Sequence, residues 1–372
     1  MVEALFWICA ALLVYTQLGY AVLLWVLARL RNPQPPSRGS DPSTLSRVSL
    51  IVAAFAEEDV IAAKVANARA LEYAGDLEVI VACDGSPDAT AQRAREAGAD
   101  VVLELPRGGK IRAQDQAVER ARGAIVAFGD ANALWEPDAL TELVAPFADP
   151  GVGYVCGQVR FVNTEGTNQE GLYWRYEMAL RSLESRLASI TGGNGAIYAT
   201  RRSDYLVVDP VMGHDLSFPF NMVKRGRRAV YAPAARATEK MVPTIGGEFA
   251  RKRRMMSHAW PIVFRGGLLS PRGYPPLYAL MIFSHRILRY AAPFLHVAAL
   301  AFNLALLGDG AIYTVALALQ LALLAAAAAP VRARPLLVAR YYVLTNASIA
   351  LGLVDWLRHG TVAHWSPPEG TR

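Results

Sequence analysis

Charged residues are scarce in this chain. Asp, Glu, Lys and Arg make up 19% of its 372 residues and hydrophobic residues 53%, whereas a typical soluble domain carries about 25% charged residues. This balance excludes a disordered or fibrous protein and disfavours a purely soluble one. The three cysteines, Cys9, Cys83 and Cys156, are too few and too scattered for a disulfide framework. The bulk of the chain is therefore expected in a reducing cytosol.

Metal-binding histidine patterns and nucleic-acid signatures are also missing. The six histidines show no ligand spacing. The basic run Arg251–Arg254 has no interleaved aromatic residues, so nucleic acid is not an expected partner. The formal net charge is +6, from 38 Lys and Arg against 32 Asp and Glu. That excess suits contact with anionic lipid or with phosphorylated ligands.

Long apolar runs stand at both ends of the chain. Ala4–Leu27 reaches roughly 36 Å as a helix, enough to cross a bilayer. Arg29 and Arg31 follow it, so the positive-inside bias places the next segment in the cytoplasm. Residues 1–30 are therefore predicted to form a transmembrane anchor, and a linker rich in Pro, Ser and Arg spans 31–46.

The second apolar region begins after Gly273. Residues 273–290 carry His285, Arg286 and Arg289 among apolar side chains, which favours a helix lying in the membrane interface. Residues 291–357 are predicted to form a C-terminal transmembrane region with two spans joined at Gly308-Asp309-Gly310. Its third apolar stretch is either a further span or an interfacial helix, because a charged and an amide residue interrupt it. Residues 358–372 form a tail.

Residues 47–272 between these regions are predicted to form a soluble domain. Short apolar runs rich in β-branched residues alternate there with helical spacing, which indicates an α/β fold with a mainly parallel sheet. The expected strands are Val48–Phe55, Leu77–Cys83, Asp100–Glu104 and Ala124–Phe128. Ligands collect beyond the carboxyl ends of such strands. Glu57, Asp84 and Asp130 are therefore the first residues to consider.

Two of the polar segments after these strands allow two interpretations each. Asp84 either accepts hydrogen bonds from a nucleobase or ribose, or accepts them from the backbone of its own turn. Gly108-Gly109-Lys110 either faces a phosphate with backbone amides and an ammonium, or only caps a helix.

Three further segments carry charge that suits catalysis or donor binding. Asp130 and Asn132 either share one hard cation such as Mg²⁺ or Mn²⁺, or end a strand and cap a helix. Asp215 is a general base or a helix cap. Arg251–Arg254 neutralises a diphosphate or faces lipid head groups and solvent.

The order of these segments resembles the membrane-bound family 2 glycosyltransferases, GT-A-fold enzymes that include cellulose, hyaluronan and succinoglycan synthases. The resemblance covers roughly residues 47 to 300. The matching segments are Ala56-Glu57-Glu58-Asp59, Cys83-Asp84-Gly85-Ser86, Gly109-Lys110-Ile111-Arg112-Ala113, Asp130-Ala131-Asn132, TGGNGAIYATRR, His214-Asp215 and EFARKRRMMSHAW.

The resemblance implies a GT-A-type Rossmann-like mixed sheet flanked by helices, with transmembrane helices at both ends. It also implies inverting, metal-dependent sugar transfer from a nucleotide sugar, with UDP as the family's commonest carrier, on the cytosolic face of a bacterial-type inner or plasma membrane. Asp215 would be the catalytic base, and Asp130 with Asn132 would hold Mg²⁺ or Mn²⁺. The implied donor-binding residues are Glu57, Asp84, Lys110, Asp130, Arg251 and Arg254.

Four departures from the family pattern qualify this reading. Cys83, Asn132 and His214 each replace an acidic residue, and the Gln-x-x-Arg-Trp motif of processive synthases is absent. We therefore expect transfer of sugar to a lipid-linked or membrane-proximal acceptor. One alternative is a processive polysaccharide synthase that needs a homo-oligomer or a partner export protein. The other is an inactive sugar-nucleotide-binding subunit.

Overall fold

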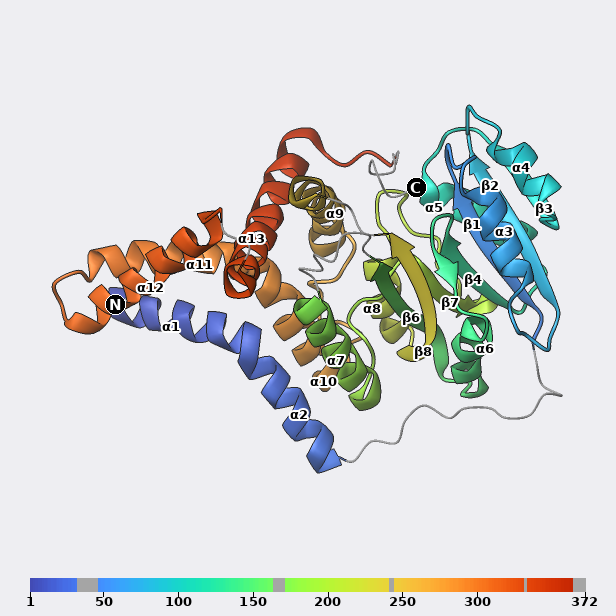
Figure 1. Cartoon of the computed structure of the whole chain (residues 1–372). Coiled ribbons are helices and arrows are strands. Elements are labelled where there is room, and N and C mark those ends of the chain that lie inside the picture. The colour runs from blue at the N-terminus through green and yellow to red at the C-terminus, as the bar shows by residue number, and fades with distance from the viewer. Residues whose placement is uncertain (32–45, 163–170, 241–243, 331–332, 364–372) are drawn as a thin grey trace.

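The computed structural model describes residues 1–31, 46–162, 171–240, 244–330 and 333–363. A sheet domain forms one end of the molecule and long apolar helices form the other (Figure 1). The predicted linker 31–46 and the predicted tail 358–372 lie largely outside the described residues.

One mixed sheet of eight strands organises the sheet domain. In spatial order the strands are β3 (Val101–Leu105), β2 (Leu77–Asp84), β1 (Val48–Ala54), β4 (Ile125–Asp130), β7 (Ile197–Arg201), β6 (Val152–Val162), β8 (Arg228–Lys240) and β5 (Leu134–Trp135). The first four are parallel, β7 runs antiparallel to β4, and β5 runs antiparallel to β8. The predicted mixed α/β fold is confirmed, and the four predicted strands agree with the observed ones to within two residues at each end.

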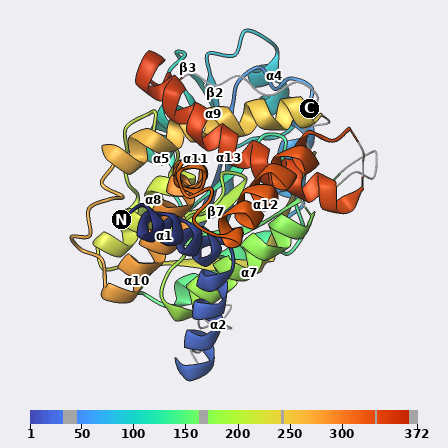
Figure 2. The same ribbon diagram turned by 90° about the vertical axis from the view of Figure 1, so that its left-hand side faces the viewer.

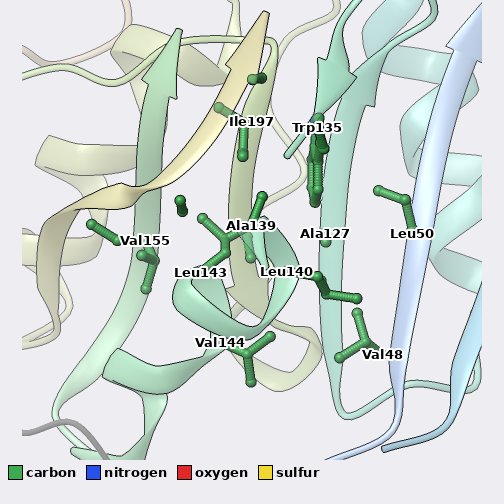
Figure 3. Packing of buried hydrophobic residues seen from close by; sticks show 14 of the residues in the cluster. Val48, Leu50, Ala127, Trp135, Ala139, Leu140, Leu143, Val144, Val155 and Ile197 are labelled. Atoms are coloured by element: carbon green, nitrogen blue, oxygen red, sulfur yellow. The ribbon is translucent and has the colours of Figure 1, made fainter. Parts of the chain in front are cut away.

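Helices pack on both faces of this sheet. They are α3 (Ile61–Arg69), α4 (Thr90–Glu96), α5 (Lys110–Arg120), α6 (Ala139–Val144), α7 (Gly171–Leu187) and α8 (His214–Lys224). The central strand β1 is buried along nearly its whole length, as expected for an apolar, β-branched strand covered on both faces. Figure 3 shows Leu140 and Leu143 of α6 packed against strand residues such as Ala127 and Val155.

Four helical segments in the described part of the chain are long and apolar enough to cross a membrane. They are Val2–Arg31, which comprises α1 (Val2–Val14), η1 (Tyr15–Gly19) and α2 (Tyr20–Arg31); Pro276–Ala305, which comprises α10 (Pro276–Met281), η5 (Ile282–Ile287) and α11 (Leu288–Ala305); α12 (Ala311–Ala328); and α13 (Arg334–His359). Seen from the apolar end, α1 lies beside α11 (Figure 2). These helices indicate membrane association.

The predicted boundary between an interface helix and a span, near residue 290, has no break in the backbone. Residues 276–305 form one continuous helical segment, so its division between interface and bilayer stays a prediction. The third C-terminal stretch is the helix α13, which packs along α9 (Ile245–Phe264). Arg253 of α9 makes a two-pronged ion pair with Asp355 of α13, with both N–O distances 2.6 Å.

A buried polar network joins the sheet domain to the apolar helices. Glu184 of α7 accepts hydrogen bonds from Tyr20 (2.7 Å) and from the backbone amide of Thr191 (3.0 Å). His285 lies between two carboxylates, 2.6 Å from Glu184 and 3.3 Å from Glu177. Arg289 pairs with Glu177. The network ties α2, α7 and the 276–305 helix to the loop that follows α7.

Candidate functional site

The carboxyl ends of β1, β2 and β4 meet at a small cavity of about 20 Å³. Four of the predicted donor-binding residues line it, namely Glu57, Asp84, Lys110 and Asp130. A larger cavity of about 220 Å³ adjoins it, because Asp84 lines both. The rule that ligands gather beyond strand carboxyl ends therefore locates the same place as the sequence motifs.

Asp84 is 4% exposed and is bound by the loop before α5. Its Oδ1 accepts hydrogen bonds from the amides of Gly108 (2.6 Å) and Gly109 (3.0 Å), and Arg107 Nη1 lies 3.4 Å from its Oδ2. These two amides therefore point at a carboxylate. The prediction that they face a phosphate is not supported by this geometry, although Asp84 fixes the loop that leads to Lys110.

Gly109 needs to be glycine for two reasons. Its φ is +93°, a backbone conformation that residues with a side chain rarely adopt. A Cβ there would also lie 2.3 Å from the carbonyl oxygen of Ala363, which packs against the loop from the far end of the chain. Thr361, two residues earlier, donates a hydrogen bond to the carbonyl of Ser257 in α9 (2.8 Å). The segment after α13 is thus held between α9 and the loop that contains Gly108 and Gly109.

Lys110 and Asp130 form an ion pair at the cavity. Burial alone would lower the pKa of Lys110, but the contacting Asp130 carboxylate, with weaker help from Asp215 and Glu239, raises it. The side chain is thus a permanent ammonium. Gly195 leaves space beside the pair, since a Cβ there would lie 3.3 Å from Lys110 Nζ and 3.8 Å from Asp130 Oδ2.

Asp215 lies in the first turn of α8. Its carbonyl oxygen accepts a 2.6 Å hydrogen bond from the amide of Gly193, two residues before the glycine that adjoins the Lys110–Asp130 pair. Its carboxylate also acts on the charge of Lys110. Asp84 and Asp130 thus meet with Lys110 at the cavity, and the Asp215 carboxylate, far from them in sequence, acts electrostatically on Lys110.

Asn132 follows Asp130 in the turn between β4 and β5, as predicted. In the residues that the structure describes, no three His, Cys, Asp or Glu side chains come close enough to hold a metal ion by themselves. The donor set nevertheless fits a hard divalent cation. Asp130 already binds a cation, the Lys110 ammonium, and an oxygen-bearing amide stands two residues on. A Mg²⁺ or Mn²⁺ site built from one or two carboxylates completes its coordination with substrate phosphates.

The basic residues Arg251–Arg254 of α9 do not all interact with the same part of the molecule. Arg251 pairs with Glu248 (2.7 Å) and contributes to the electrostatic environment of Glu239, close to Asp130. Lys252 donates to Tyr341 of α13 (2.6 Å), and Arg253 pairs with α13 as described above. Burial followed by the charge of Arg251 lowers the pKa of Arg254. Neither Arg251 nor Arg254, the two residues of this run predicted to bind the donor, lines the cavity. Arg251 does act electrostatically on Glu239.

His214 packs among buried aromatic rings, and its imidazole does not act as an acid at the site. It is 3% exposed, its Nδ1 lies 2.8 Å from the hydroxyl of Tyr198, and its ring packs 4.0 Å from Phe218. Burial, with a smaller contribution from the charge of Lys110, lowers the pKa of His214 to about 3. The ring is therefore neutral, and Asp215 is the acidic member of this pair.

Sequence reasoning missed two charged residues of the site. Lys64 of α3 is fully buried, and its Nζ donates to the carbonyl of Ala133 at 2.5 Å and lies 5.0 Å from the Trp135 ring centroid. Glu239, near the end of β8, shares the electrostatic environment of Asp130. Nothing in the sequence distinguishes Lys64 from a surface lysine. Glu239, like the residues that the sequence did predict, lies near the carboxyl end of a strand, but this strand belongs to the second half of the sheet.

Comparison with known sequences gives a consistent result. Residues 49–206 match the family described as Glycosyl transferase family 2. An N-acetylglucosaminyltransferase of Mesorhizobium japonicum is 28% identical over 261 residues, which cover 63% of this chain and 61% of that protein. A beta-monoglucosyldiacylglycerol synthase of Trichormus variabilis is 35% identical over 177 residues, covering 45% of this chain and 36% of that protein. The matches thus span about three fifths or less of these relatives' own length.

A solved structure resembles the chain along almost its whole length. It is a mannosyltransferase from Pyrobaculum calidifontis in complex with GDP-Man and Mn²⁺, with a TM-score of 0.72 and 25% sequence identity. The similarity covers 96% of this chain and 99% of that one, and so includes the apolar helices as well as the sheet domain.

Proposed function

From the match of residues 49–206 to Glycosyl transferase family 2 and the GT-A-type sheet, we propose that the chain transfers a sugar from a nucleotide sugar to a lipid-linked or membrane-proximal acceptor, with inversion. The observation that carries the proposal is the meeting of Asp84, Lys110 and Asp130 at one cavity beyond the strand ends, with the charge of Asp215 acting on Lys110. A nucleotide sugar presents a diphosphate and an anomeric carbon; Lys110 and Asp130 are the proposed partners of the first and Asp215 of the second, while Asp84 fixes the loop that leads to Lys110.

The diphosphate is the part of the donor that gains negative charge when the glycosidic bond to it breaks. Lys110 donates its ammonium protons toward this leaving group and Asp130 holds the ammonium in place. Asp130 and Asn132 are the residues that would hold Mg²⁺ or Mn²⁺, as the donor set allows. Such an ion, when bound, supplies further positive charge at the leaving diphosphate. UDP remains our expected carrier; the Pyrobaculum enzyme, which binds GDP-Man, makes GDP the principal competitor.

Asp215 removes the proton from the acceptor hydroxyl. A carboxylate at this place faces the side of the sugar opposite the diphosphate if the sugar lies over Gly195, which has no side chain between it and the Lys110–Asp130 pair. Attack from that side inverts the anomeric centre. The neutral, buried His214 cannot share this role, because its pKa of about 3 leaves it with little basicity.

Membrane association supports an acceptor at the bilayer surface. The four apolar helical segments in the described part of the chain are few for a secretion channel within one chain. The absence of the Gln-x-x-Arg-Trp motif is in agreement with a non-processive enzyme. The cytosolic placement of the sheet domain follows from the basic residues Arg29 and Arg31 after the first apolar helix, and it belongs to the proposal.

The decisive experiment incubates membranes that contain the full chain with UDP-glucose, UDP-N-acetylglucosamine, UDP-galactose and GDP-mannose in parallel. Released nucleoside diphosphate and lipid-extractable sugar are both measured. We expect one donor to give both signals, and to give neither when a chelator is present. Long insoluble product would support the processive alternative. Retained donor binding without any transfer would contradict the proposal and favour a non-catalytic subunit.

A further inference from the structure

The sheet brings a second acidic residue to the Asp130-Ala131-Asn132 turn. In the antiparallel pair of β5 and β8, Leu134 lies opposite Thr238. Continuing this register places Ala133 opposite Glu239, so Glu239, the penultimate residue of β8, lies beside the turn that carries Asp130. This placement follows from the strand register and was not visible in the sequence, where the two segments are more than 100 residues apart.

The buried ammonium of Lys64 interacts electrostatically with both acidic residues, Asp130 and Glu239. Its Nζ donates to the carbonyl of Ala133 at 2.5 Å, and it lies 3.0 Å from where a Cβ on Gly129 would be. The charges of Asp130 and Glu239 both act on this ammonium. Conversely, Asp130, Lys110, Arg251 and Lys64 are the charged groups that act on the Glu239 carboxyl. Glu239 thus belongs to the same charge cluster as Asp130.

Asn132 makes this placement consequential. A site that holds a divalent cation and a diphosphate prefers carboxylate oxygens, since they are hard, charged ligands. An amide at position 132 offers a neutral oxygen, so the turn alone supplies a single negative charge. Glu239 is the described carboxylate that the neighbouring strand brings to this turn.

Resting on the proposed function, we propose that Glu239 is the second carboxylate of the cation and diphosphate site, in the role that Asn132 cannot fill. Lys64 is then a positioning residue, which holds the Ala133 carbonyl and balances the two carboxylates. The number of carboxylates, two, agrees with a site in which substrate phosphates provide the remaining ligands.

The test measures Mn²⁺ binding and does not depend on turnover. The full chain in detergent is titrated with Mn²⁺ in the presence of UDP and, separately, of GDP, and free Mn²⁺ is followed by electron paramagnetic resonance. We expect Glu239→Gln to weaken Mn²⁺ binding by about tenfold or more, because losing even an outer-shell partner costs about 10–100-fold. Adding Asn132→Asp to this variant should restore binding, since it returns a carboxylate to the turn.

Glu119→Gln is the matched control. Glu119 is exposed and lies nine residues beyond Lys110 on α5, so the same chemical change should leave Mn²⁺ binding unaltered. Where Glu239→Gln lowers the yield of folded protein, Glu239→Asp serves instead: it keeps the charge but shortens the side chain, and binding should again weaken.

Two results would overturn the role of Glu239. One is unchanged Mn²⁺ binding in folded Glu239→Gln, and the other is failure of Asn132→Asp to restore it. Both leave the proposed function intact as long as the wild-type chain transfers sugar. Conversely, a wild-type chain that transfers no sugar from the donor panel removes the proposed function, whatever Glu239 does in the binding titration.

Discussion

Two clusters of charged side chains in this chain differ in how their charges are compensated. In the network between α7 and the apolar helices, burial tends to raise the pKa of Glu177, but the charge of Arg289 and the contact with His285 lower it well below its usual range. At the strand ends, burial and the nearby Asp130 carboxylate raise the pKa of Glu239 despite two lysines and Arg251. In the first cluster the partners hold the buried carboxylate ionised, whereas in the second, which includes the cavity-lining Asp130, the cations do not offset the effect of burial on Glu239.

The difference separates architecture from ligand binding. A buried ion network whose members all have partners holds elements together, and removing one partner leaves an uncompensated charge. A cluster in which carboxylates crowd one another is stabilised further by an added cation. The Glu177–His285–Glu184 network should therefore respond to substitution in stability, and the Asp130–Lys110–Asp215 cluster in turnover.

The largest effect is expected from Asp215→Asn. Removing the general base should lower kcat by about 10²–10⁴-fold, while donor binding is retained. Steady-state transfer assays with the preferred donor, together with a nucleotide-binding titration, measure the two properties separately. Full activity in this variant would remove Asp215 from the mechanism.

Asp130→Asn should follow closely. This change takes the ion-pair partner from Lys110 and one negative ligand from the cation site, so we expect kcat to fall by about 10²–10³-fold. Unlike Asp215→Asn, it should also weaken donor binding in the presence of Mn²⁺. Glu119→Gln provides the control, and an Asp130→Asn enzyme that transfers sugar normally without a divalent cation would contradict the assignment.

Glu184→Gln should act on stability in the other cluster. Glu184 is 1% exposed and receives hydrogen bonds from Tyr20, Thr191 and His285. Losing its charge should cost about 3–5 kcal/mol, as for other broken buried pairs. Thermal unfolding in detergent measures this loss as a lower midpoint. A variant with an unchanged midpoint and a specific loss of turnover would place the network in catalysis and break the distinction.

The smallest effect concerns pH. The pKa of His214 is about 3 in the folded chain and near 6.5 when unfolded, so the unfolded chain alone takes up this proton as the pH falls between these values. The free energy of unfolding therefore decreases from pH 6.5 downwards, and His214 contributes nothing to the pH dependence above that window. His214→Gln should make the fall of the unfolding midpoint between pH 6.5 and 4 shallower. An unchanged slope would show that His214 does not titrate in this way.

The first half of the sheet domain could be predicted in detail because each strand is a short apolar run that ends in a polar residue. The β1, β2 and β4 ends delivered Glu57, Asp84 and Asp130 to one cavity, as expected. The partners of the Gly108 and Gly109 amides were not predictable, since a side-chain carboxylate and a phosphate suit them equally. Which carboxylate acceptor stands opposite an amide depends on loop conformation.

The second half depends on contacts between distant segments, and here sequence reasoning had less to use. Glu239 meets the Asp130 turn only through the pairing of β5, a two-residue strand, with β8. Lys64 is buried because its ammonium finds a carbonyl and an indole face 69 and 71 residues away in the chain. Continuity of the 276–305 helix was likewise obscured by His285, Arg286 and Arg289, whose partners on α7 and in the following loop compensate their burial.

Ligand-induced stabilisation of the full chain tests the distinction between the two clusters most directly. The thermal midpoint is measured with and without Mn²⁺ plus UDP or GDP for the wild type, Asp130→Asn and Glu184→Gln. Ligand that binds only the folded state raises the midpoint. We expect a clear rise in the wild type and in Glu184→Gln, from a lower starting value in the latter, and little or none in Asp130→Asn. An equal rise in Asp130→Asn would contradict the assignment of the strand-end cluster as the donor site.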